Sequence, residues 1–422
     1  MRWPTAEAAA GPIRWRPPEG KCHFVNPPIN ARASLCLLWT CGLCLRLTVL
    51  AVPPVISMIQ RDLNLSGTEI GLLSGMPVVV FAIFAAPGSI VVARMGVRGA
   101  LVCGLLVAAG GTLLRIGAAN AWQLYLTTIF MSVGIAIMQP SMAAAVREWA
   151  PERSAFGTAV YTNGLIIGEI IPVATMLPFV LPYFSENWRP ALGVWAVPLI
   201  AAAVTVAIFA PKSAANGAAN MSAGWLPKWN SRLNWRIGLT LGSITSTYFC
   251  LNGFLPARLN AIGHHELISA ALTGLNAGQV PASFLLLLAA DKLQGKRWPY
   301  LVLGVLSSVC IIGIMTSASV WTVFWASLSG FSLGAALALG LALAPLLCNE
   351  PGEVALTSAA AFAIAYGFAM LVSFVSGVAW DLAGNINAVL IPILLGSLPI
   401  FVTVPRFARP EKVIAPATVS AE

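Results

Sequence analysis

Long apolar runs alternate with short polar connections along the chain. A helix that crosses a bilayer needs about 20 apolar residues, which at a rise of ~1.5 Å each cover about 30 Å of hydrocarbon. The apolar runs reach this length, and Pro, Gly and Trp residues gather at their ends. We therefore predict twelve membrane-spanning helices, at residues 34–57, 68–92, 98–118, 121–146, 155–181, 189–210, 235–256, 267–290, 298–317, 320–347, 355–380 and 386–405.

The longest polar connection between the runs divides the twelve helices into two sets of six. Loop sequences recur at corresponding places in the two halves, since residues 93–98 resemble 291–297 and residues 148–153 resemble 348–353. This arrangement is typical of a duplicated transporter, so the predicted fold class is an all-α membrane protein with two six-helix bundles. The expected divisions are a cytoplasmic amino-terminal tail at 1–33, bundles at 34–210 and 235–405, a cytoplasmic linker at 211–234 and a carboxy-terminal tail at 406–422.

Composition and charge distribution favour a membrane protein. Of the 422 residues, 58% are hydrophobic and 9% are charged, whereas soluble chains carry about 25% charged residues. The net charge of +9 does not indicate nucleic-acid binding, because the cations are spread over short loops. One side of the predicted helices holds 19 of the 24 Lys and Arg residues and the other side holds four. This asymmetry predicts a multi-pass protein of the plasma or inner membrane with both termini cytoplasmic.

No sequence pattern indicates catalysis or cofactor binding. The chain has no Walker A motif, dinucleotide fingerprint, HExxH motif or Ser-His-Asp set. Cys41 and Cys44 have the spacing of metal ligands, but they fall inside the first predicted helix with no other ligand in reach. Packing thiols are therefore the preferred interpretation. We predict a protein that is not an enzyme and has no catalytic residues, metal site or cofactor.

One charge, Arg46, lies near the middle of the first predicted helix. Insertion scales put a mid-membrane arginine at roughly 2.5–3.5 kcal/mol unfavourable, so it persists only beside a protein interior or a water-filled cavity, with a partner. It either draws an anionic or electron-rich solute into a central cavity or locks helices together in a buried ion pair. We favour solute binding, because charges at this depth usually mark a pathway. Trp39 lies seven residues earlier on the same face, as cavity wall or as ordinary packing.

Glu169, in the fifth predicted helix, is the expected partner of Arg46. It lies about 14 residues, or ~21 Å, from the cytoplasmic end of its helix, and Arg46 lies about 12 residues, or ~18 Å, from its own. An unpaired charge at this depth is very costly, so the two side chains are predicted to form an ion pair. Protonation of Glu169 would free Arg46 for an anion and couple protons to transport. A permanent structural pair is the equal alternative.

Other polar side chains at membrane depth are weaker candidates for solute contact, because most such groups form hydrogen bonds between helices. They are Gln139, Tyr161, Asn163, Asn252, Asn276, Gln279 and Tyr366.

Charged residues near the predicted helix ends have simpler expected roles. Arg115 is expected to reach the lipid headgroups, and Asp381 is expected to be exposed at the outer surface. Arg147 with Glu148, and Arg153 with Glu152, are predicted inner-loop pairs that act as a gate or lie solvated.

The loops that recur in both halves resemble those of the major facilitator superfamily. That family has a glycine and an Asp-Arg pair, then a second glycine and further basic residues, between helices 2 and 3 and again between helices 8 and 9. The first copy here keeps Arg94, Gly96 and Arg98, with Ala93 in place of the aspartate, and the second keeps Asp291 and Lys292. The resemblance implies gating roles for Arg94, Asp291 and Lys292.

Three short runs resemble the branch of the superfamily that includes cyanate and 2-nitroimidazole transporters. Cys44–Leu47 with Val52–Pro54 is similar to its Asn-Leu-Arg-Pro run in helix 1. Gly71–Pro77 and Gly134–Pro140 are similar to its helices 2 and 4.

These observations together predict a secondary active transporter of a small anionic or electron-rich solute, working by alternating access, with proton coupling through Glu169 as an open alternative. A proton-driven multidrug exporter and a non-transporting membrane sensor are the alternatives. The expected partners are a small-molecule substrate and the lipid bilayer, with protons as a third candidate and no nucleic acid. We expect a monomer.

Overall fold

The computed structural model describes residues 31–211, 231–293, 296–348 and 351–407. Every regular element in these residues is a helix. The two predicted tails and the predicted linker lie mostly outside the described residues, so their boundaries stay predictions.

Helices of the first half cover the six predicted spans in chain order. They are α1 (Ala31–Leu50), α2 (Ile56–Leu63), α3 (Gly67–Leu114), α4 (Ala121–Trp149), α5 (Ser154–Thr175), α6 (Leu181–Tyr183), α7 (Trp188–Gly193) and α8 (Ala196–Phe209), with the short turns η1 (Pro53–Val55), η2 (Arg115–Gly117), η3 (Pro151–Arg153) and η4 (Met176–Val180).

Helices of the second half follow the same scheme. They are α9 (Arg232–Ala261), α10 (Ile268–Ala277), α11 (Gln279–Leu293), α12 (Trp298–Thr316), α13 (Trp321–Leu341), α14 (Leu343–Leu347), α15 (Pro351–Ala383), α16 (Leu390–Ser397) and α17 (Pro399–Thr403), with η5 (His265–Leu267), η6 (Ile386–Val389) and η7 (Val404–Arg406).

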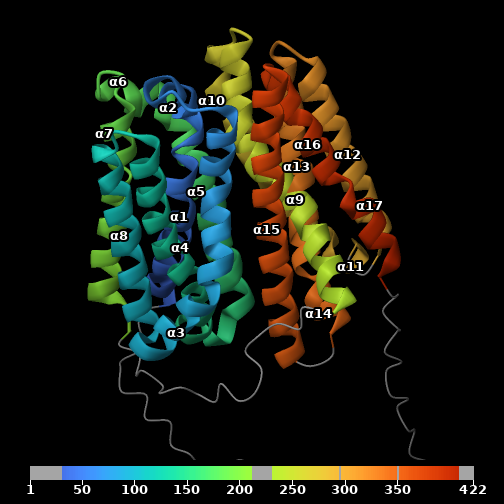
Figure 1. Ribbon diagram of the computed structural model, residues 1–422. Helices are drawn as coiled ribbons and strands as arrows, with labels where there is room; N and C mark the ends of the chain where they lie inside the picture. The colour runs from blue at the N-terminus through green and yellow to red at the C-terminus, as the bar shows by residue number, and fades with distance from the viewer. Residues whose placement is uncertain (1–30, 212–230, 294–295, 349–350, 408–422) are drawn as a thin grey trace, which may run out of the picture.

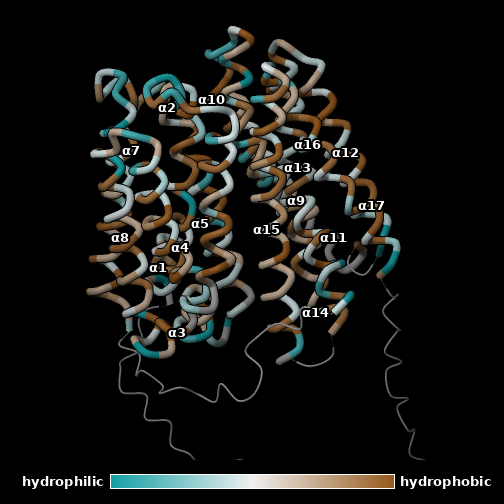
Figure 2. Tube along the Cα trace, viewed as in Figure 1, coloured by the Kyte–Doolittle hydropathy of each residue, from teal (hydrophilic) through white to brown (hydrophobic). Residues whose placement is uncertain are grey.

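The helices form two bundles that lie side by side, as the fold-class prediction requires. Figure 1 shows the first half in blue and green beside the second half in yellow to red. Apolar residues predominate along the helices and polar residues gather at their ends (Figure 2). We call the side at which α1 begins the inner side, following the predicted orientation, and the opposite side the outer side.

The second predicted span and most of the third lie in α3, which bends back on itself at Gly96. Gly96 has φ 70° and ψ 171°, a conformation that glycine adopts without the steric penalty of a Cβ. Ser74 lies in the part of α3 before Gly96, and Arg115 directly follows the part after it, yet both line one small cavity. The two parts of α3 therefore run in opposite directions. The loop that resembles the superfamily signature is thus a tight inner turn.

Ten helical segments in the described part of the chain are long and apolar enough to cross a membrane. The other two predicted spans are α9 and the pair α10–α11. The middle of α9 is buried in the protein and carries hydroxyl side chains that bond back to its own carbonyls, as Ser243 does to Leu239 and Thr247 to Ser243. A helix that faces protein rather than lipid tolerates this polarity, because each hydroxyl has an acceptor.

Candidate functional site

Arg46 and Glu169 form the predicted ion pair. Nε of Arg46, on α1, lies 3.3 Å from Oε1 of Glu169, on α5, and their side chains are 13% and 4% exposed. Counting residues from the helix ends had placed the two at similar depth, and the structure confirms that they meet. Both charges are removed from solvent and each lowers the cost of burying the other.

Glycines bring α1 and α5 close enough for this pairing. A Cβ on Gly164 would lie 2.3 Å from the carbonyl oxygen of Trp39, and one on Gly168 would lie 2.2 Å from that of Leu43. The two backbones are therefore in direct contact one turn before Glu169. Small residues four positions apart, such as Gly164 and Gly168, permit this close approach between membrane helices.

Aromatic rings flank the guanidinium of Arg46. Its Cζ lies 6.0 Å from the ring centre of Phe81, on α3, and 5.5 Å from that of Phe249, on α9. Ring faces attract a cation at this distance, more strongly where water is excluded. Phe81 also packs edge to face against Tyr366, on α15, with ring centres 6.4 Å apart. Tyr366 was a predicted site residue, whereas Phe81 and Phe249 were not.

Glu169 also bonds to the second bundle. Its Oε2 accepts a 2.7 Å hydrogen bond from Nε2 of Gln279, on α11. One carboxylate therefore binds the Arg46 cation of its own bundle and an amide of the other bundle. Gln279 thus lies at the contact between the two bundles, beside the ion pair.

Two of the predicted amides, Asn252 and Asn276, bond to each other. Oδ1 of Asn276 accepts a 2.6 Å hydrogen bond from the Tyr248 hydroxyl, and its Nδ2 donates to Oδ1 of Asn252 at 3.0 Å. The side chain of Asn252 donates in turn to the Tyr248 carbonyl. This network joins α9 to α10, as the helix–helix alternative predicted, and it places Tyr248 beside Glu169.

The remaining predicted contacts lie around this centre. Nε1 of Trp39 donates a 3.0 Å hydrogen bond to Oδ1 of Asn163 on the inner side of the ion pair. Tyr161 is half-buried next to the α1–α5 contact. Gln139 is half-buried within reach of the Tyr366 hydroxyl.

The predicted gate residues lie at the inner helix ends, away from Arg46. Arg94, Arg147 and Arg153 are exposed there. Asp291 and Lys292 fall in the last turn of α11, and their side chains are outside the described residues. Their gating role stays a prediction.

The expectation that Arg115 reaches the lipid headgroups is wrong. Its side chain is buried, with 1% of the residue exposed. Nη1 donates to the carbonyl of Thr48 at 3.1 Å and Nη2 to Oγ1 of Thr128 at 3.1 Å. The chain continues past Arg115 into η2, and α1 and α4 cover the side chain. Position near a helix end therefore did not indicate access to the membrane surface.

Part of the Arg46 guanidinium has no partner. In the described part of the chain, its Nη1 is buried and makes no hydrogen bond, and its Nε makes only the 3.3 Å contact with Glu169. A buried N–H group without an acceptor costs about 1–3 kcal/mol, and more when it is charged. The centre thus contains a cation with unused donor capacity.

Two helical bundles around a buried charge cluster define a transporter-like membrane protein, and comparison with known proteins gives its family. Residues 38–258 match the Major Facilitator Superfamily, and the chain belongs to this superfamily. It is 26% identical to the cyanate transport protein CynX of Escherichia coli (strain K12) over 351 residues, which cover 83% of this chain and 91% of that one. It is 25% identical to the 2-nitroimidazole transporter of the same organism over 356 residues, covering 84% and 90%.

Solved structures support the fold. A bacterial homologue of the human lysosomal transporter Spinster, in an inward-facing and occupied conformation, matches with a TM-score of 0.69 at 15% identity, over 90% of this chain and 96% of that one. By its superfamily and its two relatives in Escherichia coli, the protein is a multi-pass membrane transporter of a small-molecule substrate, resembling the cyanate and 2-nitroimidazole transporter branch, and not an enzyme.

Proposed function

We propose that the protein moves a small anionic or electron-rich solute across the membrane by alternating access, with Arg46 as the main binding group. The observation that carries this proposal is the unpartnered, buried Nη1 of Arg46. An anion at this position would accept the free hydrogen bond and balance the positive charge. Cyanate is the first solute to test, because a relative that covers most of the chain is named for its transport.

Glu169 is proposed as the proton-coupling group. While ionised, it holds Nε of Arg46 and accepts from Gln279 across the bundle interface. Protonation would remove the charge that competes with the solute for Arg46. Binding of an anion and of a proton would then favour each other, which is the requirement for symport.

Alternating access is supported by where the bundles are joined. Beyond the Glu169–Gln279 bond, hydrogen bonds link Ser373 to the Gly71 carbonyl and Ser269 to the Val173 carbonyl toward the outer side. We propose that this arrangement is an inward-facing state and that Arg94, Arg147, Arg153, Asp291 and Lys292 join the bundles on the inner side when the outer side opens.

The proposed setting is an inner or plasma membrane with both termini cytoplasmic, and the proposed working unit is a monomer. The excess of Lys and Arg on one side supports this orientation. Reporter fusions at the two ends test it.

A proton-driven drug exporter is the second candidate, and the rings around Arg46 favour it. Phe362 lies against Tyr366 with ring centres 5.7 Å apart, and Tyr366 contacts Phe81. Apolar and aromatic walls suit drug-sized ligands.

Uptake of radiolabelled cyanate into proteoliposomes tests the two candidates. We expect saturable uptake by the wild type, partial retention in Arg46→Lys and loss of at least ~10-fold in Arg46→Gln, because a hydrogen bond to a charged group contributes about 1.5–3 kcal/mol. Arg258→Gln, which removes a buried arginine remote from the ion pair, is the control. Loss of ethidium efflux in Arg46→Gln with no cyanate uptake in any variant would favour the exporter.

A further inference from the structure

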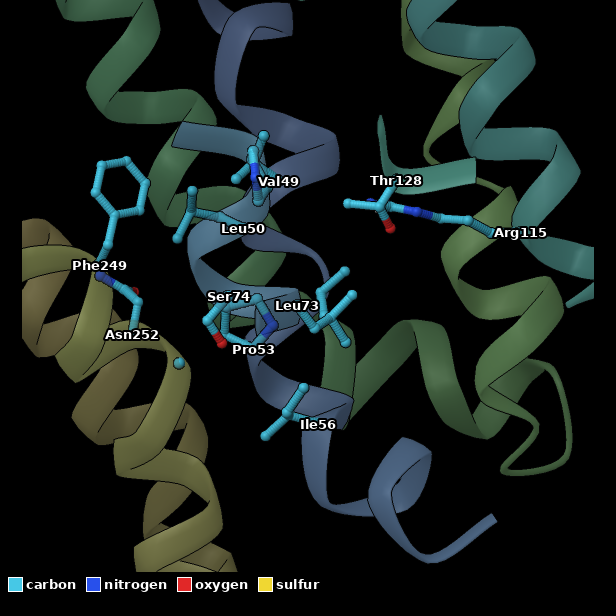
Figure 3. Close-up of a pocket in the computed structure, with 13 residues that line it drawn as sticks. Val49, Leu50, Pro53, Ile56, Leu73, Ser74, Arg115, Thr128, Phe249 and Asn252 are labelled. Atoms are coloured by element: carbon cyan, nitrogen blue, oxygen red, sulfur yellow. The ribbon is translucent and has the colours of Figure 1, made fainter. Parts of the chain in front are cut away.

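A small cavity lies on the outer side of the Arg46–Glu169 pair, between the two bundles. Its volume is about 30 Å³, which is room for about two water molecules or an anion of similar size. Figure 3 shows Arg115 and Thr128 on one side and Phe249 and Asn252 on the other, with Ser74 between them. We propose that this cavity is a second binding site for a small monovalent anion, built on Arg115. The proposal rests on the proposed function only for the identity of the anion.

Arg115 is a buried cation without a counterion. Its residue is 1% exposed, and none of the ion pairs found in the described residues includes it. It has two neutral acceptors, Thr48 and Thr128, while its Nε has no partner. An uncompensated charge at this depth is costly and usually marks a pathway.

A purely structural role does not require this charge. Helix α1 ends at Leu50, so the carbonyls of its last turn, that of Thr48 among them, need donors from outside the helix. Arg115 serves the carbonyl of Thr48. A neutral amide side chain would donate the same hydrogen bond without the cost of burying a cation. The positive charge therefore needs a further explanation, which an anion in the cavity provides.

Arg258 offers a comparison within the same protein. It is also buried, with 3% of the residue exposed. Its guanidinium is held at Asn387 and at the carbonyls of Met315 and Ser317, with only Nη1 unpartnered among the described residues, so it ties α9 to the helix ends around it. It is not among the residues that line this cavity.

One aromatic ring borders both the cavity and the central pair. Phe249 lines the cavity, and its ring centre lies 5.5 Å from Cζ of Arg46. Phe249 therefore borders both the Arg46–Glu169 pair and the cavity that Arg115 lines. An anion that entered from outside would meet Arg115 first and pass Phe249 to reach Arg46. The small volume suits a compact anion and excludes a drug-sized ligand.

Crystals of the full-length protein, purified and grown in bromide, test the site by anomalous scattering. We expect a bromide peak about 3–3.5 Å from the Arg115 guanidinium in the wild type and in Arg258→Gln, and none there in Arg115→Gln. A wild-type crystal without a peak at Arg115 would overturn the proposal, whether or not the variants fold. A peak that persists in Arg115→Gln would also overturn it.

The same crystals separate this inference from the proposed function. A peak at Arg46 without one at Arg115 would reject the second site and leave the proposed function intact. A peak at Arg115 alone would support the second site and count against Arg46 as the binding group of the proposed function. A cyanate series at constant ionic strength identifies the occupant. Displacement of bromide from Arg115 supports an anion site on the solute route, and retention supports a halide site.

Discussion

Asp381, at the outer end of α15, caps the first turn of α3 in the other bundle. Its Oδ1 accepts from the backbone N–H of Gly67 at 2.6 Å, and its Oδ2 accepts from the N–H and the hydroxyl of Thr68 at 2.8 and 2.6 Å. Asp381 is exposed, as expected from the sequence, but it is not free. A carboxylate at a helix N-terminus is stabilised by the helix dipole and by the N–H groups that lack partners there. Asp381 therefore holds the outer ends of α15 and α3 together.

We predict that Asp381→Asn weakens closure of the outer side, because the amide keeps the shape but loses the charge that three donors face. Hydrogen bonds to charged groups contribute about 1.5–3 kcal/mol, so the population of outward-open molecules should rise about tenfold or more. Spin labels at Ala119 and His265, both exposed on the outer side, would report a longer distance component. Glu353→Gln, at the inner end of α15, is the matched control. An unchanged distance distribution would show that Asp381 does not hold the outer side closed.

Solute affinity should depend on pH through Glu169. As pH falls, protonation of Glu169 frees Arg46, so the KM for an anion should fall in the wild type. Glu169→Gln imitates the protonated state at every pH and should show a low KM that no longer changes with pH. The measurement is cyanate uptake into proteoliposomes from pH 5 to 8, with Glu353→Gln as the control. If Glu169→Gln kept the wild-type profile, proton coupling would have to lie elsewhere.

The contact between α1 and α5 should not tolerate a methyl group at Gly168. A Cβ there would lie 2.2 Å from the carbonyl of Leu43, so the helices would have to separate. We expect Gly168→Ala to destabilise the protein by about 1–3 kcal/mol and to lower its Tm, as measured by tryptophan fluorescence in detergent. Gly367→Ala is the control, because a Cβ on Gly367 meets nothing within 4 Å. Equal Tm values for the two variants would contradict the close packing.

Replacing Gln279 by Leu should produce a stability loss that depends on pH. The change removes the donor to Oε2 of Glu169 and leaves a buried carboxylate oxygen unsatisfied, a cost of about 1–3 kcal/mol or more. Protonation of Glu169 reduces this cost, so the Tm gap to the wild type should be wide at pH 8 and narrow at pH 5. Gln123→Leu, at an exposed position in the first turn of α4, should show no such dependence. A gap of constant width would mean that Glu169 does not change its protonation state between pH 5 and 8.

The sequence predicted the spans and the central ion pair for a physical reason. Apolar length sets where helices cross a bilayer, and the cost of a mid-membrane charge forces Arg46 and Glu169 to pair at matching depth. The same reasoning could not predict Phe81 or Phe249, because an aromatic residue in an apolar helix carries no sign of which neighbour it faces. It failed for Arg115, because covering by α1 and α4 depends on how the helices pack. Tyr248 was not predicted as a site residue, because its position there depends on the hydrogen bond that its hydroxyl donates to Asn276.

Direct backbone contact at Gly164 and Gly168 has a consequence for motion. Two helices touching in this way travel as one rigid unit, so tilting one half of the molecule against the other cannot separate Arg46 from Glu169. The bond from Glu169 to Gln279 spans both halves, so such a tilt would stretch it. The Arg46–Glu169 ion pair would thus respond to protonation of Glu169, whereas the Gln279–Glu169 hydrogen bond would respond to movement of the bundles. A single carboxylate takes part in both.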